Sequence, residues 1–150
     1  MIALALAAGT SSLAVAQEVD TGMTTIASSY DFARTTANLE QVIADEGLNL
    51  VTTFDHAASA EAAGLDLLPT TVFVFGNPHA GTPLMQAART IALDLPQKML
   101  VWEDEVGDVF VTWREPATFA ADHGLAADHG ALPNISALLE ALARTAAGSE

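Results

Sequence analysis

The run TVFVF at residues 71–75 decides the fold class, because every residue in it is β-branched or aromatic. Such residues favour extended backbone. An uninterrupted run without polar alternation is typical of a strand that is covered on both faces or lies centrally in its sheet. We therefore predict a strand over residues 71–75 and place it in the middle of a sheet.

Alternating patterns on both sides of this run predict four more strands, at residues 24–29, 48–54, 98–103 and 109–113. The last two flank an acidic, glycine-containing turn and form a hairpin. Apolar residues at helical spacing and alanine-rich segments predict five helices. The first helix begins near Phe32, and the other four cover residues 57–63, 83–89, 117–122 and 135–145. The first helix starts at either an Asp31 cap or a Thr35 cap.

The predicted elements follow the order β α β α β α β β α α. A helix between two strands permits a parallel crossover, whereas the hairpin is antiparallel. The best fit is a two-layer α+β single domain, with a mixed sheet of about five strands and helices packed on it. A chain of 150 residues that is 51% hydrophobic fits one domain and can bury a sufficient core.

The charge balance and the cysteine count exclude several functions. The formal net charge is −14, and the five basic residues are too scattered to form a patch. Nucleic acid and anionic lipid surfaces are therefore poor partners, and we expect no binding of nucleic acid. A cationic ligand or basic partner is one interpretation of this charge, and a role in solubility alone is the other. The chain has no cysteine, which excludes thiol chemistry, disulfides and iron–sulfur clusters.

The N-terminus indicates export. Residues 1–16 form a short apolar run that ends in Ala14-Val15-Ala16, a small-x-small cleavage pattern. The run is too short for a transmembrane span, which needs about 20 apolar residues. We predict a signal peptide cleaved after Ala16 and a periplasmic or secreted protein with no stable membrane anchor.

Several motifs in order carry a resemblance to a known family. They are Asp55-His56, FGNP at residues 75–78, GTPLM at 81–85, LDLP at 93–96 and VWED at 101–104. With these motifs the chain resembles the domain of unknown function 302 family. The resemblance implies a compact α+β domain, often homodimeric, found in exported bacterial proteins and without an established activity.

The resemblance completes the predicted domain arrangement. The matching domain covers residues 28–125 and follows a leader and the start of the first strand at residues 17–27. A C-terminal helix and tail occupy residues 126–150.

The segment between the strand at 71–75 and the helix predicted from Pro83 is the candidate binding loop. Thr82 before Pro83 has the chemistry of a helix start, and Asn77-Pro78 favours a turn. The loop is therefore either a structural turn or a surface that contacts a small ligand or partner, because functional residues gather on loops held by rigid elements. The predicted contact residues are Gly76, Asn77, Pro78, His79, Gly81 and Thr82.

Histidines are the candidate metal ligands. His56, His123 and His129 are three of the four histidines, and an Asp-His-Gly unit occurs at both His123 and His129. Imidazole and nearby carboxylates suit a transition metal. The alternative is that these histidines cap helices and line turns, because no pair has a recognised ligand spacing.

No recognisable catalytic set emerges from these motifs, and no cofactor is assigned. We expect a non-catalytic, dimeric, exported domain that binds a small molecule or a protein partner. The alternatives are a metal- or haem-handling protein that uses the histidines, and an unrecognised hydrolase with a His–Asp pair.

Overall fold

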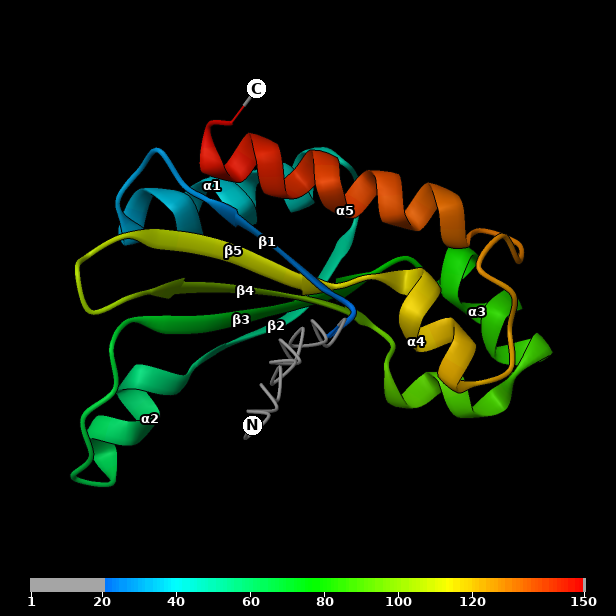
Figure 1. Ribbon diagram of the computed structural model, residues 1–150, viewed down its shortest axis with the longest axis horizontal. Helices are drawn as coiled ribbons and strands as arrows, with labels where there is room; N and C mark the ends of the chain where they lie inside the picture. The colour runs from blue at the N-terminus through cyan, green and yellow to red at the C-terminus, as the bar shows by residue number, and fades with distance from the viewer. Residues whose placement is uncertain (1–20, 150) are drawn as a thin grey trace, which may run out of the picture.

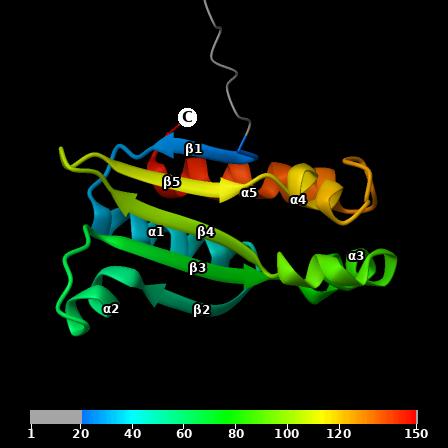
Figure 2. The same cartoon turned by 60° about the horizontal axis from the view of Figure 1, so that its bottom comes forward.

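The structure is a computed structural model that describes residues 21–149, so the predicted signal peptide lies outside the described residues. Its five strands are β1 (Met23–Ala27), β2 (Asn49–Asp55), β3 (Thr70–Gly76), β4 (Gln97–Glu103) and β5 (Val109–Arg114). They form one sheet in the order β1-β5-β4-β3-β2 (Figure 2).

The helices are α1 (Phe32–Asp45), α2 (His56–Ala62), α3 (Pro78–Ala87), α4 (Pro116–Asp122) and α5 (Leu132–Ala147). A 3-10 helix, η1 (Arg89–Leu93), follows α3. Helices α1 and α5 lie side by side on one face of the sheet (Figure 1). This arrangement confirms the two-layer α+β single domain.

The predicted mixture of parallel and antiparallel strands is wrong, because every neighbouring pair in this sheet is antiparallel. Helices α2 and α3 project from opposite ends of the sheet instead of crossing its face (Figure 1). The segments that contain them therefore act as hairpin connections. Only α1 makes a crossover, since it joins two strands that lie at opposite edges.

The central strand is β4, not β3 as predicted. The apolar run of β3 is explained by its position between β2 and β4, with Phe73 and Phe75 buried against the helical layer. The core consists of these side chains, the inward residues of β4 and β5, and the facing sides of α1 and α5. A run of β-branched and aromatic residues thus identified an interior strand but not its rank in the sheet.

Helix α1 begins at the Asp31 cap, which decides between the two predicted starts. The Asp31 side chain accepts a hydrogen bond from the backbone N–H of Arg34 at 2.8 Å. Thr35 instead lies one turn inside the helix and is fully buried.

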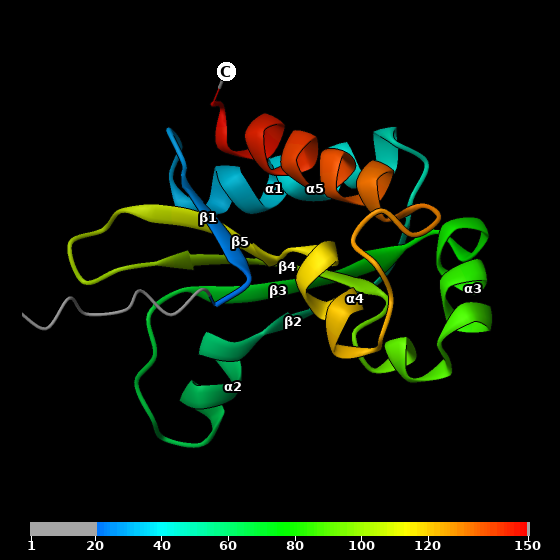
Figure 3. The same cartoon turned by 45° about the vertical axis from the view of Figure 1, so that its right-hand side comes forward.

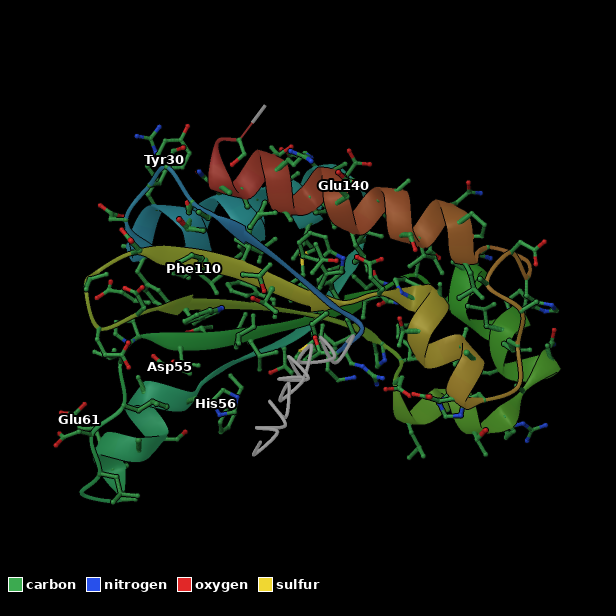
Figure 4. The ribbon with its side chains drawn as sticks, in the orientation of Figure 1. Tyr30, Asp55, His56, Glu61, Phe110 and Glu140 are labelled. Atoms are coloured by element: carbon green, nitrogen blue, oxygen red, sulfur yellow. The ribbon has the colours of Figure 1, made fainter. Side chains whose placement is uncertain are left out.

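A small polar network joins the start of α1 to the end of α5. Thr35 Oγ1 lies 2.7 Å from Ser28 Oγ and donates to the carbonyl of Asp31 at 2.8 Å. The backbone N–H of Ser29 donates to the carbonyl of Ala147, the last residue of α5, at 2.8 Å. Tyr30 lies against the end of α5 in Figure 4. The network fixes the two helices relative to each other and to β1.

We expect Thr35→Val to lower the free energy of unfolding by about 1–2 kcal/mol, because valine keeps the shape but removes the hydroxyl that bonds to Ser28 Oγ and to the carbonyl of Asp31. Thr36→Val is the matched control, since the Thr36 hydroxyl only donates to carbonyls of its own helix. Its change should stay within about 0.5 kcal/mol. Equal losses in the two variants, measured by urea unfolding, would contradict a role for the network.

Candidate functional site

An apolar cavity of about 270 Å³ lies at the end of the sheet where β2 starts and β3 ends. Residues of the N-terminal half of α5 and of α3 line it, and both helices lie at this end of the sheet in Figure 3. Its lining comprises Leu48, Asn49, Val51, Phe75, Gly76, Asn77, Pro78, Ala80, Gly81, Thr82, Met85, Leu95, Pro96, Gln97, Ile135, Leu138 and Leu139. None of these described lining residues is charged.

The predicted contact loop is mostly the first part of helix α3. Asn77 is the cap, because its side chain accepts from the backbone N–H of His79 at 2.9 Å, and Pro78 takes the first helical position. The prediction that the helix starts at Pro83 with Thr82 as its cap is wrong. Pro83 lies inside the helix, where its ring nitrogen cannot donate to the carbonyl of His79.

Five of the six predicted contact residues line the cavity: Gly76, Asn77, Pro78, Gly81 and Thr82. The sixth, His79, is exposed and is not part of the lining. Gly81 leaves room in the wall, since a Cβ there would meet Leu95 Cδ1 at 3.7 Å and Met85 Cε at 3.9 Å, both ordinary contacts.

Gln97 is the buried polar residue of the cavity lining, whereas the polar residues Asn49, Asn77 and Thr82 of the lining are exposed. It is the first residue of β4, it pairs with Phe75, and only 8% of it is exposed. Its Nε2 atom is buried without a hydrogen-bond partner, one of two such side-chain atoms among residues 21–149. The other, Trp113 Nε1, belongs to a residue outside the cavity lining. A buried amide without a partner is unfavourable unless something else accepts its hydrogen.

A β-bulge shapes the opposite wall. Leu50 pairs with Phe75, but the next pair is Thr52 with Val74, so Val51 is an extra residue in β2. Val51 lines the cavity while remaining largely exposed. Bulges re-aim side chains and occur next to functional sites.

The predicted metal ligands are not brought together. His56 starts α2, where its ring lies edge-on to Phe54 with centroids 4.8 Å apart (Figure 4). His123 follows α4 at the other end of the sheet (Figure 1). His129 lies in the connection to α5. Within residues 21–149, no group of three or more His, Asp or Glu side chains is placed to share a metal ion.

His123 instead belongs to an ion-pair cluster around Asp94. Its Nε2 lies 2.7 Å from Asp94 Oδ2, and its Nδ1 lies 2.9 Å from Thr90 Oγ1. Arg114 donates to Asp94 Oδ1 at 2.7 Å and to Asp122 at 3.2 Å. Asp94 and His123 are 22% and 10% exposed. The cluster ties α4 and β5 to the segment that leads into the cavity wall at Leu95.

Sequence reasoning missed Gln97 and the residues of α5 as parts of the cavity lining. The predicted strand began at Lys98, so Gln97 was left outside it. The signal was present, because Gln97, Met99 and Val101 share one face of an alternating strand and Gln97 is the polar member. The contribution of α5 carried no local signal, since its apolar stripe reads as ordinary core.

The family comparison identifies the class of this fold. The family described as "Domain of unknown function DUF302" matches residues 24–145, so the chain belongs to this family. The crystal structure of an uncharacterized conserved DUF302 protein from Bacillus stearothermophilus superposes with a TM-score of 0.76 and 19% identity. The match covers 84% of this chain and 98% of that one. Both results confirm the resemblance, and the second confirms the fold.

Three Brucella proteins are similar in sequence to this chain over 111 residues. Each is 43% identical to it and is named a fluoride-specific ion channel: FluC 1 in Brucella suis and Brucella abortus, and FluC 2 in Brucella melitensis. The matches cover 74% of this chain but only 41–44% of each relative. The chain thus spans less than half the length of these relatives. Among residues 21–149, no helix is both long and apolar enough to cross a bilayer.

We expect Asp94→Ala to lower the free energy of unfolding by about 2 kcal/mol, because it removes the shared acceptor of Arg114 and His123. Asp128→Ala, which changes an exposed carboxylate, is the control and should change stability by less than about 0.5 kcal/mol. Chemical denaturation of the three proteins at pH 7 measures both effects. An Asp94→Ala protein as stable as the control would show that the cluster does not anchor α4.

Proposed function

We propose that this domain binds a small molecule in the cavity between α3, α5 and the sheet, and that it does so without catalysing a reaction. The observation that carries the proposal is that Gln97, a residue of the lining of a mostly apolar cavity, has a buried amide nitrogen with no hydrogen-bond partner in the protein. Binding pockets combine apolar lining with a few placed polar groups in this way. A bound acceptor would remove the unfavourable burial of that amide.

The cavity size supports a ligand rather than a packing defect. Voids larger than a water molecule are few in folded domains. At about 270 Å³ this cavity exceeds an engineered apolar cavity of roughly 150 Å³ that binds benzene. Its volume is close to the lower end of small-molecule pockets, roughly 300 Å³.

Gly81 offers a test by filling the cavity. We expect native mass spectrometry of the wild-type protein, prepared without harsh extraction, to show a bound small mass. Gly81→Leu should lose this mass because its side chain occupies the cavity, whereas Gly81→Ala should keep it. The alanine variant should also be more stable by about 0.5–1 kcal/mol, since glycine weakens a helix interior.

A wild-type protein that carries no bound mass would contradict ligand binding at this site. So would a bound mass that Gly81→Leu retains, because that mass would lie elsewhere.

The channel activity named for the Brucella relatives belongs, in this proposal, to the part of those proteins that this chain does not match. More than half of each relative lies outside the match. The described helices of this chain are too short or too polar to span a bilayer. The matched part would then act as a ligand-binding domain in both contexts.

Export and self-association complete the proposal. The apolar run at residues 1–16 supports export to the periplasm.

The sheet face opposite α1 and α5 supports dimerisation, because no helix of residues 21–149 crosses its middle (Figure 1). This face carries the apolar residues Phe54, Val72, Leu100, Trp102 and Phe110. Trp102 and Phe110 stack with ring centroids 4.7 Å apart. We call these five residues the open apolar face.

The open apolar face suits a second copy of this chain. Phe54 is 49% exposed, and cross-strand neighbours join it to Val72 and Leu100 in one continuous row. The five residues carry no charge, although the chain as a whole has a net charge of −14. Two such faces can meet without bringing carboxylates together.

We expect Phe54→Glu to weaken a dimer at least tenfold, because it places a carboxylate against its own copy across the two-fold axis. Leu93→Glu is the control: Leu93 is 83% exposed on η1, outside the open apolar face. Sedimentation equilibrium measures the dissociation constants. A monomeric wild type, or equal effects of both variants, would contradict dimerisation through this face.

A further inference from the structure

The structure assigns a chemical class to the cavity ligand: a small, neutral, mostly apolar molecule that presents one hydrogen-bond acceptor to Gln97. This inference rests on the proposed function and narrows it. Three features of the cavity wall carry it: its lack of charge, the one buried donor, and its volume.

The uncharged wall disfavours a ligand whose charge would be buried against it. None of the side chains that line the cavity in residues 21–149 is acidic or basic. Burying a carboxylate, phosphate or ammonium there would leave it without a counter-charge, which is strongly unfavourable. The net charge of −14 disfavours anions further, because it gives the surroundings of the cavity a negative potential.

The donor at Gln97 sets the polar requirement of the ligand. Its Nε2 carries hydrogens that no protein group accepts, so the complementary ligand atom is a carbonyl, ether or hydroxyl oxygen. The other two amides of the lining, Asn49 and Asn77, are exposed, and Asn77 uses its side-chain oxygen to cap the helix. Gln97 is fixed at the start of a strand and is 8% exposed, so it can orient the ligand with little loss of side-chain freedom.

Most of the remaining wall is apolar, apart from Asn49, Asn77 and Thr82, which are exposed, and it sets the size. Phe75, Leu139, Ile135 and Met85 line it from three different elements. The volume of about 270 Å³ is nearly twice that of the roughly 150 Å³ cavity that accepts benzene. An aromatic or short aliphatic molecule with a single ketone fits this space, whereas a haem or a dinucleotide does not.

The test uses the intact protein and three probes with nearly the same skeleton. Acetophenone offers a carbonyl acceptor, ethylbenzene lacks it, and benzoate replaces it with a charge. Dissociation constants are measured at pH 7 by calorimetry for the wild type and for Gln97→Leu. We expect Gln97→Leu to lower the acetophenone affinity relative to the ethylbenzene affinity at least about tenfold, the effect of one buried hydrogen bond.

Further controls keep the result decisive. Gln97→Leu should itself unfold at a higher temperature than the wild type without ligand, because leucine removes an unpartnered polar group. Gln97→Met serves as a second variant that retains the side-chain length. Benzoate should not bind at concentrations that saturate the site with acetophenone. Sodium fluoride should have no more effect on thermal unfolding than sodium chloride, because the proposal assigns the fluoride-channel activity of the Brucella relatives to the part that this chain does not match.

The possible failures separate the two proposals. If neither acetophenone nor ethylbenzene binds, the ligand class assigned here is overturned, while the bound mass and its loss in Gly81→Leu still decide the proposed function. If both bind and their affinity ratio is the same in Gln97→Leu, ligand binding stands but the role of Gln97 is overturned. If benzoate binds as tightly as acetophenone, the neutral ligand class is overturned.

Discussion

The placement of β1 and β2 at opposite edges of the sheet is the constraint on which the rest of the structure depends. Because α1 connects them, it must cross the covered face and share that face with α5. The bonds from Thr35 and Ser29 hold the start of α1 against the end of α5. The other half of α5 extends beyond α1 towards α3 and α4 at the end of the sheet (Figure 1). Residues of this half of α5, of α3 and of the strand ends together line the cavity.

The ion-pair cluster around Asp94 and the cavity wall are only a few residues apart in the sequence. Asp94 binds Arg114 and His123, and the next three residues, Leu95 to Gln97, belong to the cavity wall. The ionic groups therefore fix that segment from outside, where water still reaches them, while the wall itself stays uncharged. An arrangement of this kind keeps an apolar site rigid without burying a salt bridge in it.

Residue patterns predicted the elements well but not their neighbours. The run at residues 71–75, the hairpin and the alternating patterns at 24–29 and 48–54 predicted five strands and the α+β class, because periodicity reports which residues are covered. It does not report strand direction, so helices that project from the sheet were read as crossovers. The cavity illustrates the same limit: the Gly76–Thr82 segment carries turn-forming residues that local chemistry can identify, whereas Gln97 and Leu138 meet it only through tertiary packing.

The bulge at Val51 also affects whether the edge of the sheet can pair with a strand from another chain. Strand β2 is an outer strand, and a regular outer strand offers unpaired backbone groups to any other extended chain. One extra residue breaks the regular spacing of those groups and increases the local twist. The same irregularity that places Val51 at the cavity therefore makes β2 a poor template for further strands, and so protects the sheet against growth into aggregates.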